Sequence, residues 1–150
     1  MDIQIDSREK AIKKIIQTFE ERGINYVSSK LMVGDYMSFD NPRLIVDRKQ
    51  NLSEIYSNLC HQHERFKKEL IRAEKYNIKL IILCEHGGSI KGLEDVKTWV
   101  NPRLKETPYA WDGERLHKVM RTVAEKYGIQ WEFCSKNQTG TRIIELLGGV

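Results

Sequence analysis

The sequence predicts an α/β protein with a mixed central β-sheet flanked by helices. Short strand patterns alternate along the chain with amphipathic helical patterns, which is typical of this class. One strand pattern, over residues 78–86, is a near-continuous apolar run rich in isoleucine, as expected for a strand covered on both faces. The chain has 150 residues and shows no repeat or linker, so we expect a single domain over residues 1–150.

The first third of the chain predicts one helix between strands. Residues 2–6 alternate apolar and polar side chains, which indicates a short strand. Residues 10–23 carry apolar side chains at helical spacing and end on Gly23, a typical helix terminator. Three further strands are predicted after it, interrupted at Gly34 and by a turn at "DNP": residues 24–33, 36–39 and 43–49.

A helical pattern then extends over residues 53–76, with apolar and basic side chains on different faces. The apolar stripe consists of Ile55, Leu59, Phe66, Leu70 and Ala73, and the basic face consists of Arg65, Lys68, Arg72 and Lys75. After the central strand, the pattern predicts a short helix, an irregular segment, a longer helix, a strand and a final helix: residues 93–100, 101–113, 114–128, 129–135 and 139–148.

Composition and charge narrow the class of protein. No apolar run approaches the roughly 20 residues that span a bilayer, and the first residues do not resemble a signal peptide. The three cysteines are an odd number without a CxxC pair, so we expect reduced thiols and an intracellular protein. The net charge is +4, and residues 61–150 carry the whole excess, with 16 Lys and Arg against 12 Asp and Glu. This excess is compatible with a phosphate-rich partner.

The predicted strand over residues 43–49 runs directly into three charged residues, Asp47, Arg48 and Lys49. Successive side chains of a strand point to opposite faces, so Asp47 and Lys49 project together and Arg48 projects the other way. A carboxylate that holds a divalent ion, beside a lysine that orients water, suits metal-dependent cleavage of a phosphodiester. The strand end therefore predicts a site.

A magnesium site needs more than one oxygen ligand, so a second acid is expected near Asp47. Asp35 is the best candidate, because it follows the break at Gly34 in the hairpin whose other arm carries Asp47. Eleven residues separate Asp35 from the Asp47-x-Lys49 motif. The alternative for Asp47 and Lys49 is a solvated strand end with an incidental ion pair.

Four motifs in order resemble the XPF-type (xeroderma pigmentosum group F) nuclease domains of the PD-(D/E)XK superfamily. They are "IDSRE" from Ile5, "VGDY" from Val33, "VDRK" from Val46 and "ERF" from Glu64. The resemblance covers nearly the whole chain, and it implies a restriction-endonuclease-like core. It also implies a metal-dependent DNA endonuclease, structure-specific for branched DNA such as junctions and flaps, with roles in DNA repair or recombination.

The resemblance assigns roles to residues of this chain. It implies that Asp6, Asp35 and Asp47 are the acids around Mg²⁺, for which Mn²⁺ can substitute, and that Lys49 positions the attacking water. It implies a supporting shell of charged residues that pair with the acids or meet the scissile phosphate: Arg8, Glu9, Arg48 and Arg65. With that substrate, the basic face of Arg65, Lys68, Arg72 and Lys75 is expected to contact the DNA backbone, the alternative being a solvated helix face.

The sequence departs from the family pattern at two points. The acid that follows the third motif in the family falls on Ser53 here, with Glu54 adjacent. The helix-hairpin-helix pair that usually follows the nuclease domain has no counterpart before Val150. Standalone versions of the resembled domain are familiar from phage and bacterial genomes, so the resemblance implies a protein of the cytoplasm of a bacterial or phage-infected cell.

We also expect a homodimer that associates through residues 113–150, the part that XPF-type domains use for self-association. The alternative function is a non-catalytic DNA-binding or scaffold module of the same family. A repair- or restriction-type nuclease with another DNA substrate is a third possibility. Inactive copies typically lose the acids or the lysine, whereas Asp35, Asp47 and Lys49 are all present here, which favours the enzyme.

Overall fold

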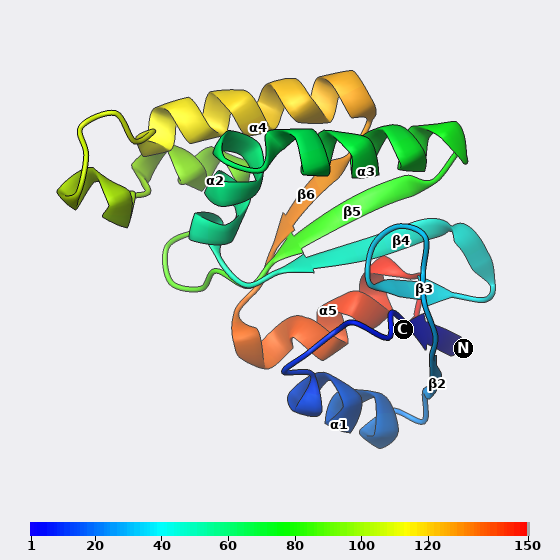
Figure 1. The fold of residues 1–150 in the computed structure, drawn as a ribbon. Helices are drawn as coiled ribbons and strands as arrows, with labels where there is room; N and C mark the ends of the chain where they lie inside the picture. The colour runs from blue at the N-terminus through cyan, green and yellow to red at the C-terminus, as the bar shows by residue number, and fades with distance from the viewer. Residues whose placement is uncertain (150) are drawn as a thin grey trace.

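The computed structural model describes residues 1–149, so Val150, the last residue of the expected domain and association segment, lies outside the described residues. A six-stranded mixed sheet runs through the molecule in the order β2-β1-β3-β4-β5-β6 (Figure 1). β3 is antiparallel to both of its neighbours, and the other pairs are parallel. The strands are β1 (Asp2–Ile5), β2 (Asn25–Ser28), β3 (Tyr36–Ser38), β4 (Asn41–Lys49), β5 (Lys79–Cys84) and β6 (Gln130–Phe133).

Helices cover both faces of the sheet (Figure 1). α1 and α5 pack together on one face, and α2, α3 and α4 lie on the other. The helices are α1 (Lys13–Glu21), α2 (Leu52–Cys60), α3 (His63–Lys75), α4 (Gly113–Tyr127) and α5 (Thr139–Leu146), with short 3₁₀ turns η1 (Leu93–Thr98), η2 (Pro102–Lys105) and η3 (Lys136–Gln138). None of the described helices is long and apolar enough to cross a membrane.

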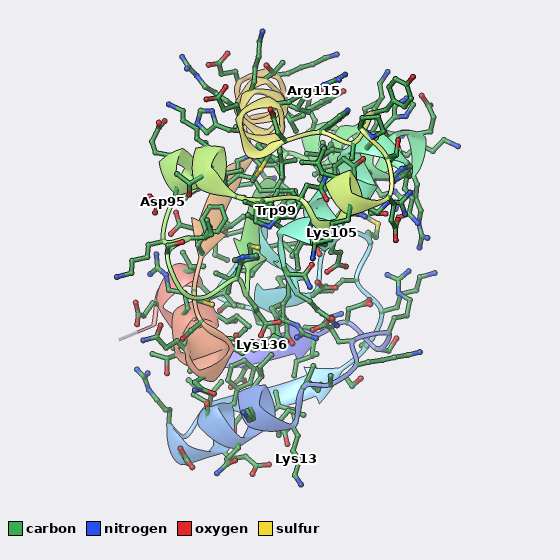
Figure 2. All side chains as sticks on the ribbon, turned by 90° about the vertical axis from the view of Figure 1, so that its left-hand side faces the viewer. Lys13, Asp95, Trp99, Lys105, Arg115 and Lys136 are labelled. Atoms are coloured by element: carbon green, nitrogen blue, oxygen red, sulfur yellow. The ribbon has the colours of Figure 1, made fainter. Side chains whose placement is uncertain are left out.

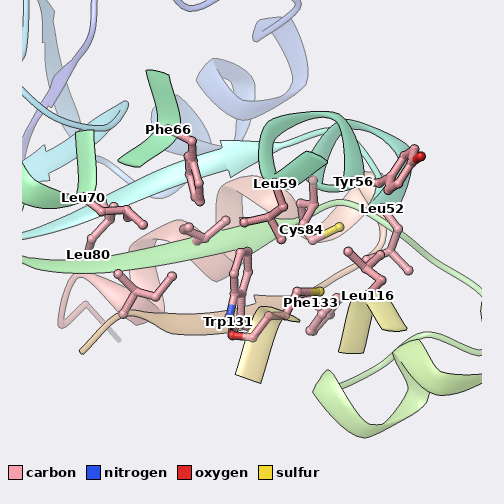
Figure 3. Close-up of a cluster of buried hydrophobic side chains, with 14 of the residues drawn as sticks. Leu52, Tyr56, Leu59, Phe66, Leu70, Leu80, Cys84, Leu116, Trp131 and Phe133 are labelled. Carbon is pink, nitrogen blue, oxygen red and sulfur yellow. Dashed lines mark hydrogen bonds between the residues drawn. The ribbon is translucent and has the colours of Figure 1, made fainter. Parts of the chain in front are cut away.

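Two apolar clusters fill the space between the sheet and its helices. The cluster under α2, α3 and α4 includes Phe66, Leu80 and Leu116, and Figure 3 shows side chains of this cluster between the strands and the helices. The cluster under α1 and α5 includes Phe19, Tyr36 and Ile143. Because β4 and β5 alternate between the two clusters, both strands are buried on both faces, and polar side chains remain only where the strands end.

The predicted α/β class, the mixed sheet and the flanking helices are confirmed, and the apolar stripe predicted on residues 53–76 is buried. The single helical stretch predicted there is wrong, because the chain turns at His61 and Gln62 between α2 and α3. Both of their backbone N–H groups donate to the carbonyl of Ser57, which closes α2. No glycine or proline marks this turn, so the sequence pattern gave no sign of it.

The β3–β4 hairpin brings the two central acids of the prediction together. Tyr36 pairs with Val46. Asp35 and Asp47 are the next residues beyond this pair, so they lie next to each other at the end of the β3–β4 pairing. Gly34 precedes Asp35 with a φ of +69°, and a Cβ at this position would collide with the side chain of Ile45. Only glycine therefore allows the chain to enter the hairpin in this way.

Candidate active site

Asp35, Asp47 and Lys49 line one cleft of about 360 Å³ between the hairpin and α3. The Lys49 Nζ atom lies 3.4 Å from Asp47 Oδ2, so the predicted projection of this pair to one face is confirmed. Asp35 Oδ2 accepts a hydrogen bond of 2.8 Å from the backbone N–H of Arg48, which fixes the carboxylate against the end of β4. Two carboxylates and one ammonium thus converge where β3 begins and β4 ends.

The single ammonium of Lys49 does not balance the two carboxylates. Asp47 is only 4% exposed, and its Oδ2 atom accepts no hydrogen bond. The pKa of Asp35 is raised well above its ordinary value. The larger cause is burial, and the second is the negative charge of Asp47. A buried carboxylate oxygen without a hydrogen bond is costly; the Lys49 ammonium at 3.4 Å offsets part of this cost, and a divalent cation would offset the rest.

The oxygen ligands that the cleft offers fit magnesium better than a metal ion whose ligands all come from protein side chains. Among residues 1–149, no group of three or more His, Cys, Asp or Glu side chains is arranged to hold a metal ion. Mg²⁺ is commonly bound through one or two carboxylates, with water and substrate phosphate oxygens completing the octahedron. Asp35 and Asp47 supply that number of carboxylates.

Lys49 stays protonated although its side chain is largely buried. Burial would lower its pKa, but the neighbouring charges of Asp47 and Glu69 outweigh burial and raise the pKa above its usual range. Its Nζ atom also lies 5.7 Å from the centre of the Phe66 ring, which closes one side of the lysine. The ammonium is therefore held as a fixed positive charge beside Asp47.

Glu69 of α3 is a member of the cleft that the sequence prediction missed. Its Oε1 atom accepts a hydrogen bond of 3.3 Å from the backbone N–H of Gly34, which links α3 to the loop before Asp35. Burial and the nearby charge of Asp47 raise its pKa. Its position one residue before the apolar Leu70 and one after the basic Lys68 gave no signal beyond a charged helix face.

Asp6 also lines the cleft, but hydrogen bonds already occupy its carboxylate. Oδ1 accepts from the backbone N–H of Leu31 at 2.8 Å, and Oδ2 accepts from Arg8 Nε at 2.9 Å. Burial raises the pKa of Asp6, but the hydrogen bonds from Arg8 and Leu31 outweigh it, and the pKa is lowered. Asp6 thus anchors the loop after β2 at the rim of the cleft, and its predicted role as a metal ligand stays a prediction.

Arg48 projects to the opposite face of the sheet, as the strand alternation predicts. Its guanidinium pairs with Glu9 at 2.9 Å and with Glu85 at 2.7 Å, and all three side chains are largely buried. Glu9 also accepts from the Tyr36 hydroxyl at 2.6 Å, and Glu85 accepts from the Thr139 hydroxyl at the same distance. Arg48 and Glu9 therefore support Asp35 from behind, without lining the cleft.

The basic face of α3 borders the cleft only in part. Arg65, Lys68 and Arg72 line it, and Arg72 Nη1 also donates to the carbonyl of Met32 at 3.1 Å. Lys75, at the end of the helix, is exposed and does not line the cleft. The cleft therefore joins a pair of buried acids to a rim of exposed cations.

Glu54, rather than Ser53, faces the site. A smaller hollow beyond Lys49 is lined by Glu54, Arg65 and Glu69, whereas Ser53 is exposed on α2. Glu54 also helps to cap the start of α2: its N–H donates to the side chain of the N-cap residue Asn51, and its Oε1 atom accepts from the N–H of Gln50 at 2.7 Å.

A family model described as the ERCC4 domain matches residues 5–147. No curated protein matches the chain. The structure of XPF from Aeropyrum pernix is similar, with a TM-score of 0.71 and 22% sequence identity over 98% of this chain and 63% of that one. A second structure of that protein, in complex with DNA, gives a TM-score of 0.68 and 20% identity over 97% of this chain and 62% of the other. The chain thus spans a little under two thirds of the relatives' length.

Proposed function

Because this chain belongs to the ERCC4 domain family, the XPF-type nuclease domains, we propose that it is a Mg²⁺-dependent endonuclease for branched DNA, with Mn²⁺ as a possible substitute. The observation that carries the proposal is the convergence of Asp35, Asp47 and Lys49 in one cleft. Asp47 Oδ2 has no hydrogen bond and lies 3.4 Å from the Lys49 ammonium, and the pKa of Asp35 is raised; both observations describe a carboxylate pair that a divalent cation would stabilise. An incidental ion pair at a solvated strand end would not be buried in this way.

The chain's own groups divide the work of phosphodiester hydrolysis. Asp35 and Asp47 would hold the ion, which when bound supplies an acidified water and neutralises charge on the phosphate. Lys49 would orient the attacking water and stabilise the negative charge that develops on the phosphate oxygens. Arg48, fixed by Glu9 and Glu85, keeps Asp35 in place through its backbone N–H.

The rim of the cleft suits a polyanionic substrate. Arg65, Lys68 and Arg72 stand beside the acids, where they can contact the phosphates that flank the scissile bond. Arg8 also lines the cleft, where it pairs with Asp6 while its side chain stays 64% exposed. The preference for junctions and flaps, and a role in repair or recombination, rest on the family alone, and the relative solved in complex with DNA supports DNA as the substrate.

We propose in addition that the protein works as a homodimer. Among residues 113–149, no large hydrophobic side chain is exposed, which gives less apolar surface than the sequence suggested. The half-buried Val119 and Val123 line a shallow hollow along α4, and this is the surface that would meet a partner copy. Light scattering should give twice the chain mass, and a monomer at every concentration with full cleavage would refute the dimer.

A substrate panel tests the nuclease proposal. Labelled flaps, junctions, linear duplexes and single strands would be incubated with the protein in Mg²⁺, Mn²⁺ or EDTA. We expect cleavage of branched DNA with either metal and none in EDTA. Binding of branched DNA without cleavage under all conditions would instead favour the non-catalytic module, and cleavage of linear DNA alone would favour a restriction- or repair-type substrate.

A further inference from the structure

A second hollow, of about 440 Å³, lies on the other face of the sheet from the cleft, where α1 begins. Three lysines from two distant parts of the sequence line it, and the buried Arg48 and Glu85 form its floor. The lysines are Lys13, Lys14 and Lys136, and all of them are exposed. Lys13 and Lys136 lie on the side of the molecule that faces the viewer in Figure 2.

The positive charge of this hollow is not balanced by acids. Among residues 1–149, none of the three lysines forms an ion pair, and Lys14 Nζ contacts only the neutral amide oxygen of Asn137, at 3.3 Å. Glu85 is the one acid that lines the hollow, and it pairs with Arg48 at 2.7 Å. Because Arg48 also pairs with Glu9, this cluster keeps one negative charge, which the three lysines outweigh. An excess of positive charge in a hollow favours an anion.

The hollow and the cleft are joined by one short stretch of chain. Arg48 and Gln50 line the hollow, whereas Lys49 between them lines the cleft. On the neighbouring loop, Asp6 and Arg8 reach the cleft, and the hollow follows from Ala11 onward. A polyanion that crosses this edge of the sheet would therefore meet both basic surfaces.

We propose that the three-lysine hollow binds the phosphate backbone of DNA away from the scissile bond, on the opposite face of the sheet from α3. This inference rests on the proposed nuclease function and extends it, because it divides the substrate between two basic surfaces on either side of the active-site edge. Lysine ammonium groups contact phosphates as point charges without reading bases. The hollow thus adds position and affinity, and the base sequence of the DNA has no influence on it.

The test is DNA binding as a function of salt, by fluorescence anisotropy with a labelled branched DNA. The Lys13→Ala/Lys14→Ala/Lys136→Ala variant is compared with a control that removes the same charge from exposed positions outside both basic surfaces and outside α4, Lys91→Ala/Lys97→Ala/Lys105→Ala. The slope of log K against log salt should fall by about 0.9 for each phosphate that the first variant no longer neutralises. We expect the affinity of this variant to fall tenfold or more at low salt, and that of the control to change by less than twofold.

The outcomes separate this inference from the function on which it rests. If the wild type binds DNA and the hollow variant keeps the same slope and affinity, the hollow is not a DNA surface, although the nuclease proposal stands. Equal decreases in affinity for both triple variants would show a general charge effect and would also overturn the inference. If the wild type binds no DNA at all, both proposals fail. Unfolding curves confirm that each variant is folded.

Discussion

Of the acids in the cleft, Asp35 is the one whose charged form is most disfavoured by its surroundings. Burial, followed by the charge of Asp47, raises its pKa, so the folded protein without metal retains a proton that the unfolded chain releases. Stability must then fall as the pH rises above the ordinary carboxyl pKa, because the native state binds more protons than the unfolded state in that range. A cation in the cleft would remove this penalty.

We therefore predict that Asp35→Asn stabilises the metal-free protein at pH 8, on the order of 1 kcal/mol, or roughly 2–4 °C in Tm. The side-chain amide still offers an oxygen to the N–H of Arg48. The difference from the wild type should shrink as the pH falls below 3.8, the ordinary pKa of an aspartate, because Asp35 then becomes protonated in the unfolded state as well. Thermal unfolding in EDTA at several pH values measures this, and a variant that is less stable at pH 8 would contradict it.

The end of β4 holds the site through its alternation, with Asp47 and Lys49 towards the cleft and Arg48 towards the far face. Arg48 pairs there with Glu9 and Glu85 in a region closed to solvent. Removing one partner of a buried ion pair leaves uncompensated charge, which typically costs about 3–5 kcal/mol. Arg48→Ala should lower the free energy of unfolding by that much in urea, whereas Arg43→Ala, at the exposed start of the same strand, should change it by less than about 0.5 kcal/mol. Equal effects would show that the cluster is not stabilising.

α3 presents its lysines to two different environments. Lys68 lines the cleft, whereas the adjacent Lys67 faces the groove towards α4. Lys68→Ala should weaken DNA binding and lower the salt slope by about 0.9, the value expected for one phosphate, and Lys67→Ala should leave both unchanged. Anisotropy titrations at several salt concentrations measure this pair. A larger effect of Lys67→Ala would mean that the DNA contacts the side of α3 that faces α4, which would contradict the proposed cleft.

Periodicity and motif order were enough to predict the class, the sheet and the meeting of Asp35 with Asp47, because the hairpin between them is short and its register follows from the apolar pattern. Three features depend on tertiary packing and could not be read from the sequence. The turn at His61 between α2 and α3 contains no glycine or proline. Glu69 reaches the cleft only because of the path of α3. The carboxylate of Asp6 accepts a hydrogen bond from the backbone N–H of Leu31. Glu85 gave a weak signal, as an acid directly after a buried strand.

Across the molecule, cations collect on both sides of the edge where β4 ends. The rim of α3 lies on one face, the three-lysine hollow lies on the other, and the acids lie between them in the cleft. The core under each face is continuous and apolar, so the edge itself is the place where charge gathers. If both proposals hold, a long polyanion would lie along this edge with the carboxylates at its middle.

The cleavage of labelled flap DNA by Asp47→Asn, in Mg²⁺ and next to the wild type and Lys49→Ala, tests the proposed site most directly. Asp47→Asn removes one metal ligand and one negative charge beside the phosphate. We predict that it lowers the cleavage rate by a factor on the order of 10³ or more, while DNA binding stays equal or tightens. Lys49→Ala should be similarly slow, but Mn²⁺ binding measured by calorimetry should survive in it and be abolished in Asp47→Asn. A wild-type rate in Asp47→Asn, with contaminating nuclease excluded, would contradict the site.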